Sequence, residues 1–136
     1  MIGKVNLINV PQIILIPDAP VANNFSYTVL DDNNKLILIQ FTLATDANVA
    51  TRRVGVFISD GTNFIKSFFE DIGQVASNTT SYLFCVGNSV TSTVHPFTPI
   101  TKIPPFVLNT GWKIECEIVN IQAGDAVTFA RFVSHK

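Results

Sequence analysis

Few residues in this 136-residue chain could carry catalysis. His95 and His135 are the only histidines, and nucleophilic hydrolysis needs a Ser or Cys beside a histidine that a carboxylate orients. His95 stands in the Pro-rich run VHPFTP, His135 is next to last in the chain, and no Gly-x-Ser-x-Gly motif occurs. We therefore predict that the protein is not an enzyme.

Carboxylates could support other chemistry, but their spacing is not specific. Glu115 and Glu117 would lie about 7 Å apart on one strand, within reach of a glycosidase mechanism, but Lys113 beside them favours a solvated outer face. The segments 31–34 (DDNN) and 60–63 (DGTN) are rich in oxygen atoms, yet neither has the spacing of an EF-hand loop. The cysteines and histidines are too scattered for a structural zinc site. We predict no metal and no cofactor.

The adjacent arginines Arg52 and Arg53 lie within TDANVATRRVGVFISDGTNFI. Neighbouring strand residues point to opposite faces and the formal net charge is −1, so we expect no nucleic-acid binding. Two interpretations of the pair remain. In the first, which we favour, one arginine faces solvent and the other covers apolar surface with its stem. In the second, one of them pairs with an acidic group on another chain.

Two pairs of turn residues predict connections between strands. Asp60-Gly61 separates the runs RRVGVFIS and TNFIKSFF, and an Asp-Gly pair between alternating apolar runs is a strong hairpin signal. Gly124-Asp125 precedes the run AVTFARFVS in a similar way. We assign structural roles in turns to Asp60, Gly61, Gly124 and Asp125.

The elements that would position these residues are β-strands, because apolar residues recur at a period of two almost throughout. In WKIECEIVNI every second residue from Trp112 to Ile118 is apolar, and in RRVGVFIS the same holds from Val54 to Ile58. The run KLILIQFTLAT is apolar on both faces at its start, which favours the centre of a sheet. Only a short piece, 67–76, has weak helical character.

The pattern predicts one all-β domain, an antiparallel β-sandwich or jelly-roll-like fold of about eight strands. Residues 25–136 would form the sandwich, and 1–24 a Pro-rich N-terminal arm or edge segment, because proline cannot lie in the middle of a sheet. Cys85 and Cys116 lie within strand patterns. We expect no secretory signal peptide, and therefore two buried thiols rather than a disulfide.

Composition points to contact with other chains. Charged residues make up 14% of the sequence, against about 25% in an average soluble protein, and apolar residues make up 47%. Another chain is therefore expected to cover part of the apolar surface; the alternative is a polar surface built from Asn, Thr and Ser. No apolar run is long enough to span a bilayer, so we expect no membrane insertion.

Two stretches, TDANVATRRVGVFISDGTN and GWKIECEIVNIQAGDAVTFARFVS, resemble a pattern of small β-sandwich structural proteins of tailed bacteriophages, which are head decoration or virion-associated proteins. The resemblance covers residues 35 to 134 approximately and consists of strands and turns rather than a catalytic signature. The matching positions are Asp46, Asn48, Arg52, Arg53, Asp60, Gly61, Gly111, Trp112, Gly124 and Asp125.

The resemblance implies a non-enzymatic virion protein that is assembled in the host cytoplasm. Its expected role is that of a capsid decoration or cement protein that binds the major capsid protein or another virion protein and stabilises the head. A head-fibre base and a head-tail component are further candidates. We expect a homo-oligomer, with a trimer favoured.

Two further hypotheses concern binding surfaces. The segment IILIPDAPVANN could act as an arm that adds a strand to a neighbouring chain, and its first four residues are candidate contacts: Ile13, Ile14, Leu15 and Ile16. The alternative function is a carbohydrate- or receptor-binding module of a phage head fibre or tail. It would need exposed aromatic side chains, for which Tyr27, Tyr82 and Trp112 are the candidates, although each is more easily explained by packing.

Overall fold

The computed structural model describes residues 12–32, 34–87 and 99–135. These residues form ten β-strands in two sheets, and no helix occurs among them. The strands are β1 (Gln12–Leu15), β2 (Ser26–Thr28), β3 (Asn34–Ala44), β4 (Arg53–Ser59), β5 (Phe64–Phe69), β6 (Thr79–Val86), β7 (Ile100–Ile103), β8 (Val107–Leu108), β9 (Lys113–Val119) and β10 (Ala126–His135). The all-β prediction is confirmed.

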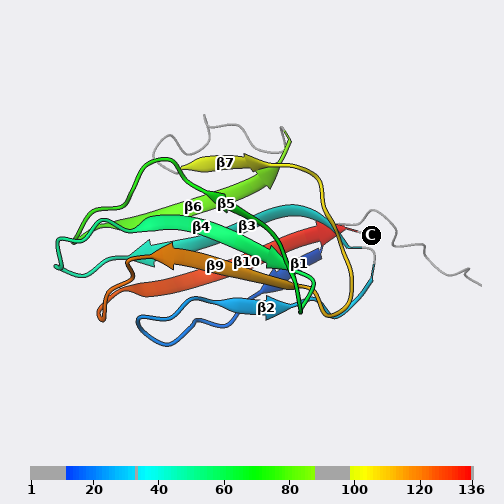
Figure 1. Cartoon of the computed structure of the whole chain (residues 1–136), viewed down its shortest axis with the longest axis horizontal. Helices are drawn as coiled ribbons and strands as arrows, with labels where there is room; N and C mark the ends of the chain where they lie inside the picture. Colours follow the sequence, from blue (N-terminus) through cyan, green and yellow to red (C-terminus); the bar gives the residue numbers. More distant parts are fainter. Residues whose placement is uncertain (1–11, 33, 88–98, 136) are drawn as a thin grey trace, which may run out of the picture.

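The two sheets pack face to face as a sandwich (Figure 1). One sheet has the order β1-β10-β3-β6-β7, with β8 paired to β3, and the other has the order β2-β9-β4-β5. Six connections cross from one sheet to the other: β1–β2, β2–β3, β3–β4, β5–β6, β8–β9 and β9–β10. Without β7 and β8, this is the strand order of a jelly roll, with two four-stranded sheets.

The structure corrects the predicted elements in one place. The segment 67–76 is not helical: residues 67–69 end β5, and the following residues form a turn that ends in a bridge between Gln74 and Arg52. The predicted antiparallel β-sandwich is confirmed, and within it β6 and β7 pair in parallel. The segment between these two strands, which contains His95, lies mostly outside the described residues.

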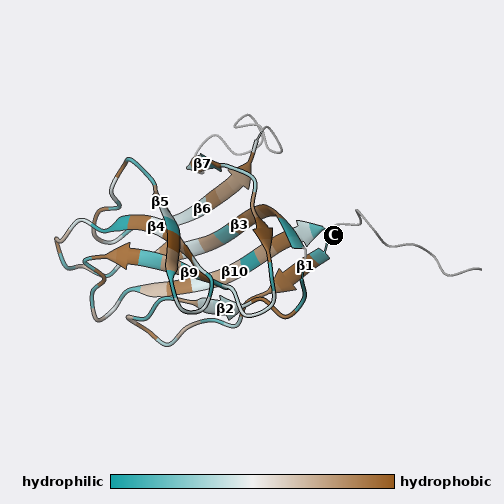
Figure 2. Cartoon of the chain, turned by 45° about the vertical axis from the view of Figure 1, so that its right-hand side comes forward, coloured by the Kyte–Doolittle hydropathy of each residue, from teal (hydrophilic) through white to brown (hydrophobic). Residues whose placement is uncertain are grey.

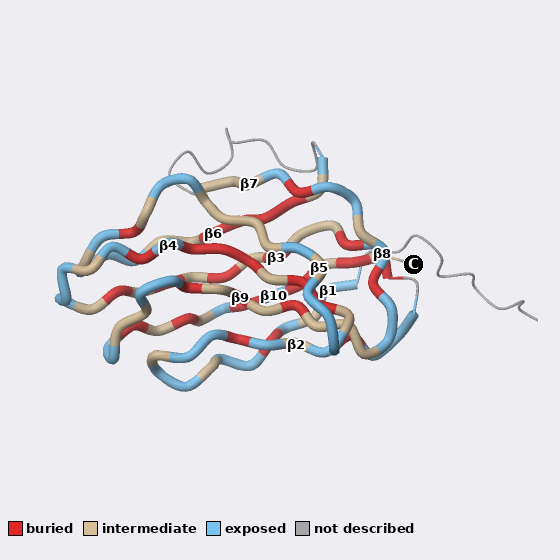
Figure 3. The backbone as a smooth tube through the Cα atoms, viewed as in Figure 1, coloured by how far each residue is buried: buried red, intermediate tan, exposed pale blue. Residues whose placement is uncertain are grey.

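The core follows from the alternation of apolar residues along β4 and β9. Val54, Val56 and Ile58 are fully buried, and they face the core together with Ile114 and the neighbouring apolar residues of β9. Figure 2 shows the alternation as changes of hydropathy along the strands, and Figure 3 shows buried residues in the middle of the strands. Burial of these side chains is the main stabilising term of the sandwich.

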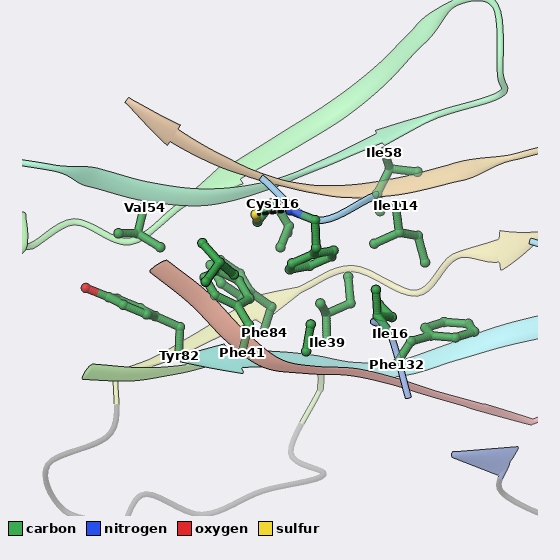
Figure 4. Packing of buried hydrophobic residues seen from close by; sticks show 14 of the residues in the cluster. Ile16, Ile39, Phe41, Val54, Ile58, Tyr82, Phe84, Ile114, Cys116 and Phe132 are labelled. Atoms are coloured by element: carbon green, nitrogen blue, oxygen red, sulfur yellow. Dashed lines mark hydrogen bonds between the residues drawn. The ribbon is translucent and has the colours of Figure 1, made fainter. Parts of the chain in front are cut away.

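Aromatic rings fill the centre of the core (Figure 4). The ring of Phe41 lies 5.3 Å from that of Phe25, 5.7 Å from that of Tyr82 and 6.1 Å from that of Phe84, measured between centroids. Phe41, Tyr82 and Phe84 belong to one sheet, whereas Phe25 directly precedes β2 of the other, so the contact between Phe25 and Phe41 joins the two layers.

Both cysteines are buried and free, as predicted. Cys116 lies in the core, where its sulfur accepts a hydrogen bond from the amide of Phe25 at 3.1 Å. Burial raises the pKa of Cys116 to about 12, so its thiol stays protonated at neutral pH.

Two irregularities break the alternation in the sheet that contains β1. The register between β10 and β3 shifts twice, between Thr128 and Arg131 and between Val133 and Ser134. At the first shift Val127 and Ala130 are buried, whereas Phe129 between them is exposed. Such β-bulges change which side chains point outward, and the first one shapes a groove on the outer face of the sheet.

Candidate functional site

Arg52 directly precedes β4 and its side chain is completely buried. The guanidinium forms two parallel hydrogen bonds to Asp125, from Nε to Oδ2 at 2.8 Å and from Nη2 to Oδ1 at 2.8 Å. Nη2 also donates to Oδ1 of Asp46 at 2.6 Å. A two-pronged arginine–carboxylate contact is one of the stronger polar interactions in proteins. We call Arg52, Asp46 and Asp125 the Arg52 cluster.

The remaining donors of Arg52 are also satisfied within the chain. Nη1 donates to the carbonyl of Asn48 at 2.7 Å and to the carbonyl of Ala50. An arginine side chain has five N–H donors, and here each has an acceptor. Arg52 therefore has no donor left for another chain. This corrects the expectation that the arginine pair divides between solvent and the cover of an apolar surface.

Asp125 is as buried as Arg52, and its charge is compensated from several directions. Its carboxylate accepts hydrogen bonds from the amides of Asp46 and Gln122, both at 2.8 Å. Burial by itself would raise the pKa of Asp125, but the hydrogen bonds from Arg52 and from these two amides outweigh burial and lower the pKa. The hydrogen bond to Asp125 is also the main reason why the pKa of Arg52 is raised.

The Arg52 cluster connects four loops at one end of the sandwich: 45–52, 70–78, 120–125 and the loop between β1 and β2. Residues 45–52 and 120–125 supply its charged side chains, and the carbonyl of Asp125 accepts the amide of Ala22 at 2.8 Å. Gln74 joins the loop 70–78 to the cluster, because its backbone and that of Arg52 exchange hydrogen bonds of 2.8 and 2.9 Å. This end is on the left in Figure 1.

Each of these loops except 120–125 exposes large aliphatic side chains. The exposed fractions are 59% for Val21, 90% for Val49, 76% for Ile72 and 57% for Val75. We call these four side chains, on the loops fixed by the Arg52 cluster, the loop end. Exposed apolar side chains that form a contiguous patch mark protein interaction sites.

Arg53, in contrast, is exposed at the start of β4. Its guanidinium carbon lies 4.5 Å from the centre of the Phe69 ring on the neighbouring strand β5. This cation–π contact covers part of an aromatic side chain, which agrees with one half of the favoured interpretation of the pair.

A second candidate surface is a groove of about 550 Å³ on the outer face of the other sheet, beside β1 and β10. Its lining includes the apolar Leu15, Pro17 and Phe129 and the polar Asp18, Gln40 and Arg131. We call it the β1–β10 groove.

The predicted contact segment IILI divides between the core and this outer face. β1 pairs with β10 of its own chain, so successive side chains point to opposite sides of the sheet. Ile13 and Leu15 are 65% and 77% exposed, whereas Ile16 is buried and Ile14 packs against the core. The first half of the predicted arm, residues 1–11, lies outside the described residues.

Phe129 stands at the edge of the groove in an unusual conformation. Its φ is +53°, in the left-handed region that L-residues rarely adopt, and its side chain is 78% exposed. The amide of Phe129 donates to Oδ1 of Asp18 at 3.1 Å, which holds the bulge in place. Nearby, Nε of Arg131 donates to Oε1 of Gln40 at 2.7 Å.

Of the predicted turn residues, Asp60 and Gly61 lie between β4 and β5. Oδ1 of Asp60 accepts the amides of Thr62 and Asn63 at 2.8 and 2.6 Å, and Gly61 has a φ of +96°. Gly124 lies beside the Arg52 cluster, where its amide donates to Asp46 at 2.9 Å. Asp125 combines its place in this turn with the buried ion pair.

Several residues of these surfaces were missed at the level of sequence. Asp46 was named only as a matching position of the resemblance, and Gln74 was not named, because their contacts reach other loops. Val49 and Ile72 did leave a signal, since each is a single large aliphatic residue within a polar turn segment, DANVAT and EDIGQ. Phe129 could not be recognised as an exposed residue, because strict alternation places it on the same face as the buried Val127.

Among the described residues, no group of three or more Cys, His, Asp or Glu side chains could hold a metal ion. The same residues include no helix that is long and apolar enough to cross a membrane.

The chain has a structural neighbour among viral proteins. No protein-family model matches it, and no curated protein matches its sequence. A chain in the structure of infectious bursal disease virus, Gx strain, is similar with a TM-score of 0.47 and 12% sequence identity. The similarity covers 99% of this chain and 34% of that chain, so this chain spans about a third of the other's length.

Proposed function

We propose that the protein is a non-enzymatic structural protein of a virion, a decoration protein that binds the major capsid protein through the loop end and stabilises the head. The observation that carries this proposal is the loop end itself, where exposed aliphatic side chains stand on loops that a buried ion-pair cluster fixes. The resemblance to structural proteins of tailed phages supports the same role.

The physical argument rests on preorganisation. Binding through loops normally costs conformational entropy, because the loops must be ordered in the complex. Here the hydrogen bonds of Arg52, Asp125 and Gln74 order the loops before binding. The aliphatic side chains then remove apolar surface from water on contact, and many such contacts on a capsid lattice add up to tight attachment.

The alternative, a carbohydrate- or receptor-binding module, receives less support. Tyr27 and Trp112 are only partly exposed and both pack against the core, and Tyr82 is buried with its hydroxyl donating to Gln74 at 2.7 Å. An aromatic platform for a sugar ring would need such side chains to stand free.

The test uses capsids that lack this protein, heated with and without the purified chain. Added wild-type protein is expected to raise the temperature at which the capsids open. The double variant Val49→Glu/Ile72→Glu is expected to lose this effect, because it places charges within the apolar contact.

A matched control changes exposed apolar residues at the opposite end of the sandwich, Leu30→Glu/Phe64→Glu, whose side chains are 72% and 60% exposed in the wild type. This variant should protect capsids like the wild type. Equal loss of protection in both variants would contradict a site at the loop end, and failure of the wild-type protein to bind capsids would contradict the proposed function.

A further inference from the structure

We propose that the β1–β10 groove joins two copies of this chain across a two-fold axis, with the Phe129 ring of each copy seated in the groove of the other. This inference is independent of the proposed function, because it concerns a different face of the molecule. Its evidence is a strained and exposed aromatic residue, a groove beside it, and opposite charges along the groove.

Phe129 combines two unfavourable features at one position. A positive φ is disfavoured for a residue with a Cβ, and a Phe ring that is 78% exposed leaves apolar surface in water. Glycine or asparagine would fit the same bulge more easily. Backbone strain of this kind concentrates at functional sites, and here it directs an aromatic ring away from the protein.

The bulge is held by the segment that follows β1. Asp18 accepts the amide of Phe129 at 3.1 Å, and the amide of Ile16 donates to the carbonyl of Ala130 at 2.9 Å. The groove beside it has apolar walls that include Leu15 and Pro17 and a volume of about 550 Å³, which is ample for one aromatic side chain. Ring and groove are therefore both formed before any contact.

The positions of the charged side chains in the groove favour a second copy of this chain as its occupant. Asp18 and Arg131 both line the groove, both are exposed, and the ion pairs of the described residues do not include either of them. Arg131 lies opposite Leu15 in the β1–β10 pair, whereas Asp18 is three residues further along the chain, beside Phe129. The two charges thus occupy different positions along the strands.

A two-fold axis perpendicular to the sheet makes the strands of the second copy run in the opposite direction. The order of Asp18 and Arg131 along the groove is therefore reversed in that copy. Each Arg131 then faces Asp18 of the other copy, and each Phe129 faces the other groove. A contact that uses the same patch on both chains is isologous and closes after two copies. It therefore predicts dimers or other even-numbered assemblies, in place of the trimer that the sequence favours.

The first experiment measures molar mass by light scattering over a range of protein concentrations. The wild type is expected to dimerise, and Phe129→Asn, which suits the left-handed backbone, is expected to weaken dimerisation at least tenfold. Phe64→Asn removes another exposed ring, from β5, and should dimerise like the wild type. A trimer, a wild-type monomer at every concentration, or a Phe129→Asn variant that dimerises normally would overturn the inference.

The second experiment tests the charges. Asp18→Lys and Arg131→Glu should each weaken dimerisation, because like charges meet twice. An equimolar mixture of the two variants should form heterodimers, in which every facing pair again has opposite charges. No recovery in the mixture would overturn the inference, since loss of the Asp18–Phe129 hydrogen bond is the same with and without mixing. The proposed function is tested separately, by measuring whether the dimerisation variants still protect capsids against heat.

Discussion

The loop end and the β1–β10 groove both expose apolar side chains, but the fold supports them in different ways. At the loop end, three charged side chains lie together and the buried pair of Arg52 and Asp125 anchors the loops. At the groove, one exposed carboxylate holds one bulge. The first surface depends on a buried ion pair, and the second on a strained backbone that an exposed hydrogen bond from a distant segment holds. Damage to each should therefore have different consequences for stability.

The largest expected effect is the loss of the buried ion pair. Arg52→Met leaves Asp125 buried without its cation, which costs about 3–5 kcal/mol of unfolding free energy. Arg53→Met is the matched control, because it removes only an exposed cation–π contact worth about 0.5–1 kcal/mol. Urea unfolding followed by tryptophan fluorescence of Trp112 measures both. Equal effects of the two substitutions would show that the Arg52 cluster does not stabilise the fold.

A smaller effect is expected from acid. The pKa of Asp125 is lower in the folded protein than the ordinary value of about 3.9, so its stabilising contribution is complete above that value and is lost as the pH falls through the folded-state pKa. We expect protonated Asp125 to keep part of its hydrogen bonding, so the loss of stability should be smaller than that caused by Arg52→Met.

Urea midpoints between pH 7 and pH 3 measure this effect. Asp125→Asn should flatten the decline below pH 4. The control is Asp60→Asn, at an exposed turn carboxylate whose pKa is also lowered, mainly by the amides of Asn63 and Thr62. If the Asp125→Asn variant had the same pH dependence of stability as the wild type, Asp125 would not be the cause of the loss of stability in acid.

The smallest expected effect has the opposite sign. Phe129→Asn should leave the stability of the monomer unchanged or raise it by up to about 1 kcal/mol, because asparagine tolerates the left-handed region better than phenylalanine. Thermal unfolding at a concentration at which both proteins are monomeric checks this. A clear loss of stability would mean that the Phe129 ring packs on its own chain, and the contrast between the two surfaces would disappear.

The sequence determined the class of fold because β-structure leaves a local record. Alternation from Val54 to Ile58 and from Trp112 to Ile118 predicted strands, and the turn residues between the runs predicted their separation. The same alternation predicted the burial of Cys116, whose neighbours two positions away are also apolar. The alternation can be read within each strand, without knowing which strands pair with one another.

Only the tertiary structure decided which residues form the surfaces. Arg52 meets Asp125 across 73 positions of the sequence, so no local pattern distinguishes this buried arginine from its exposed neighbour Arg53. The bulge at Phe129 reverses the alternation that places it inside, because the register with β3 shifts there. A period of two is fixed by the backbone of each strand, whereas partners and bulges are fixed by the way in which distant strands and loops pack.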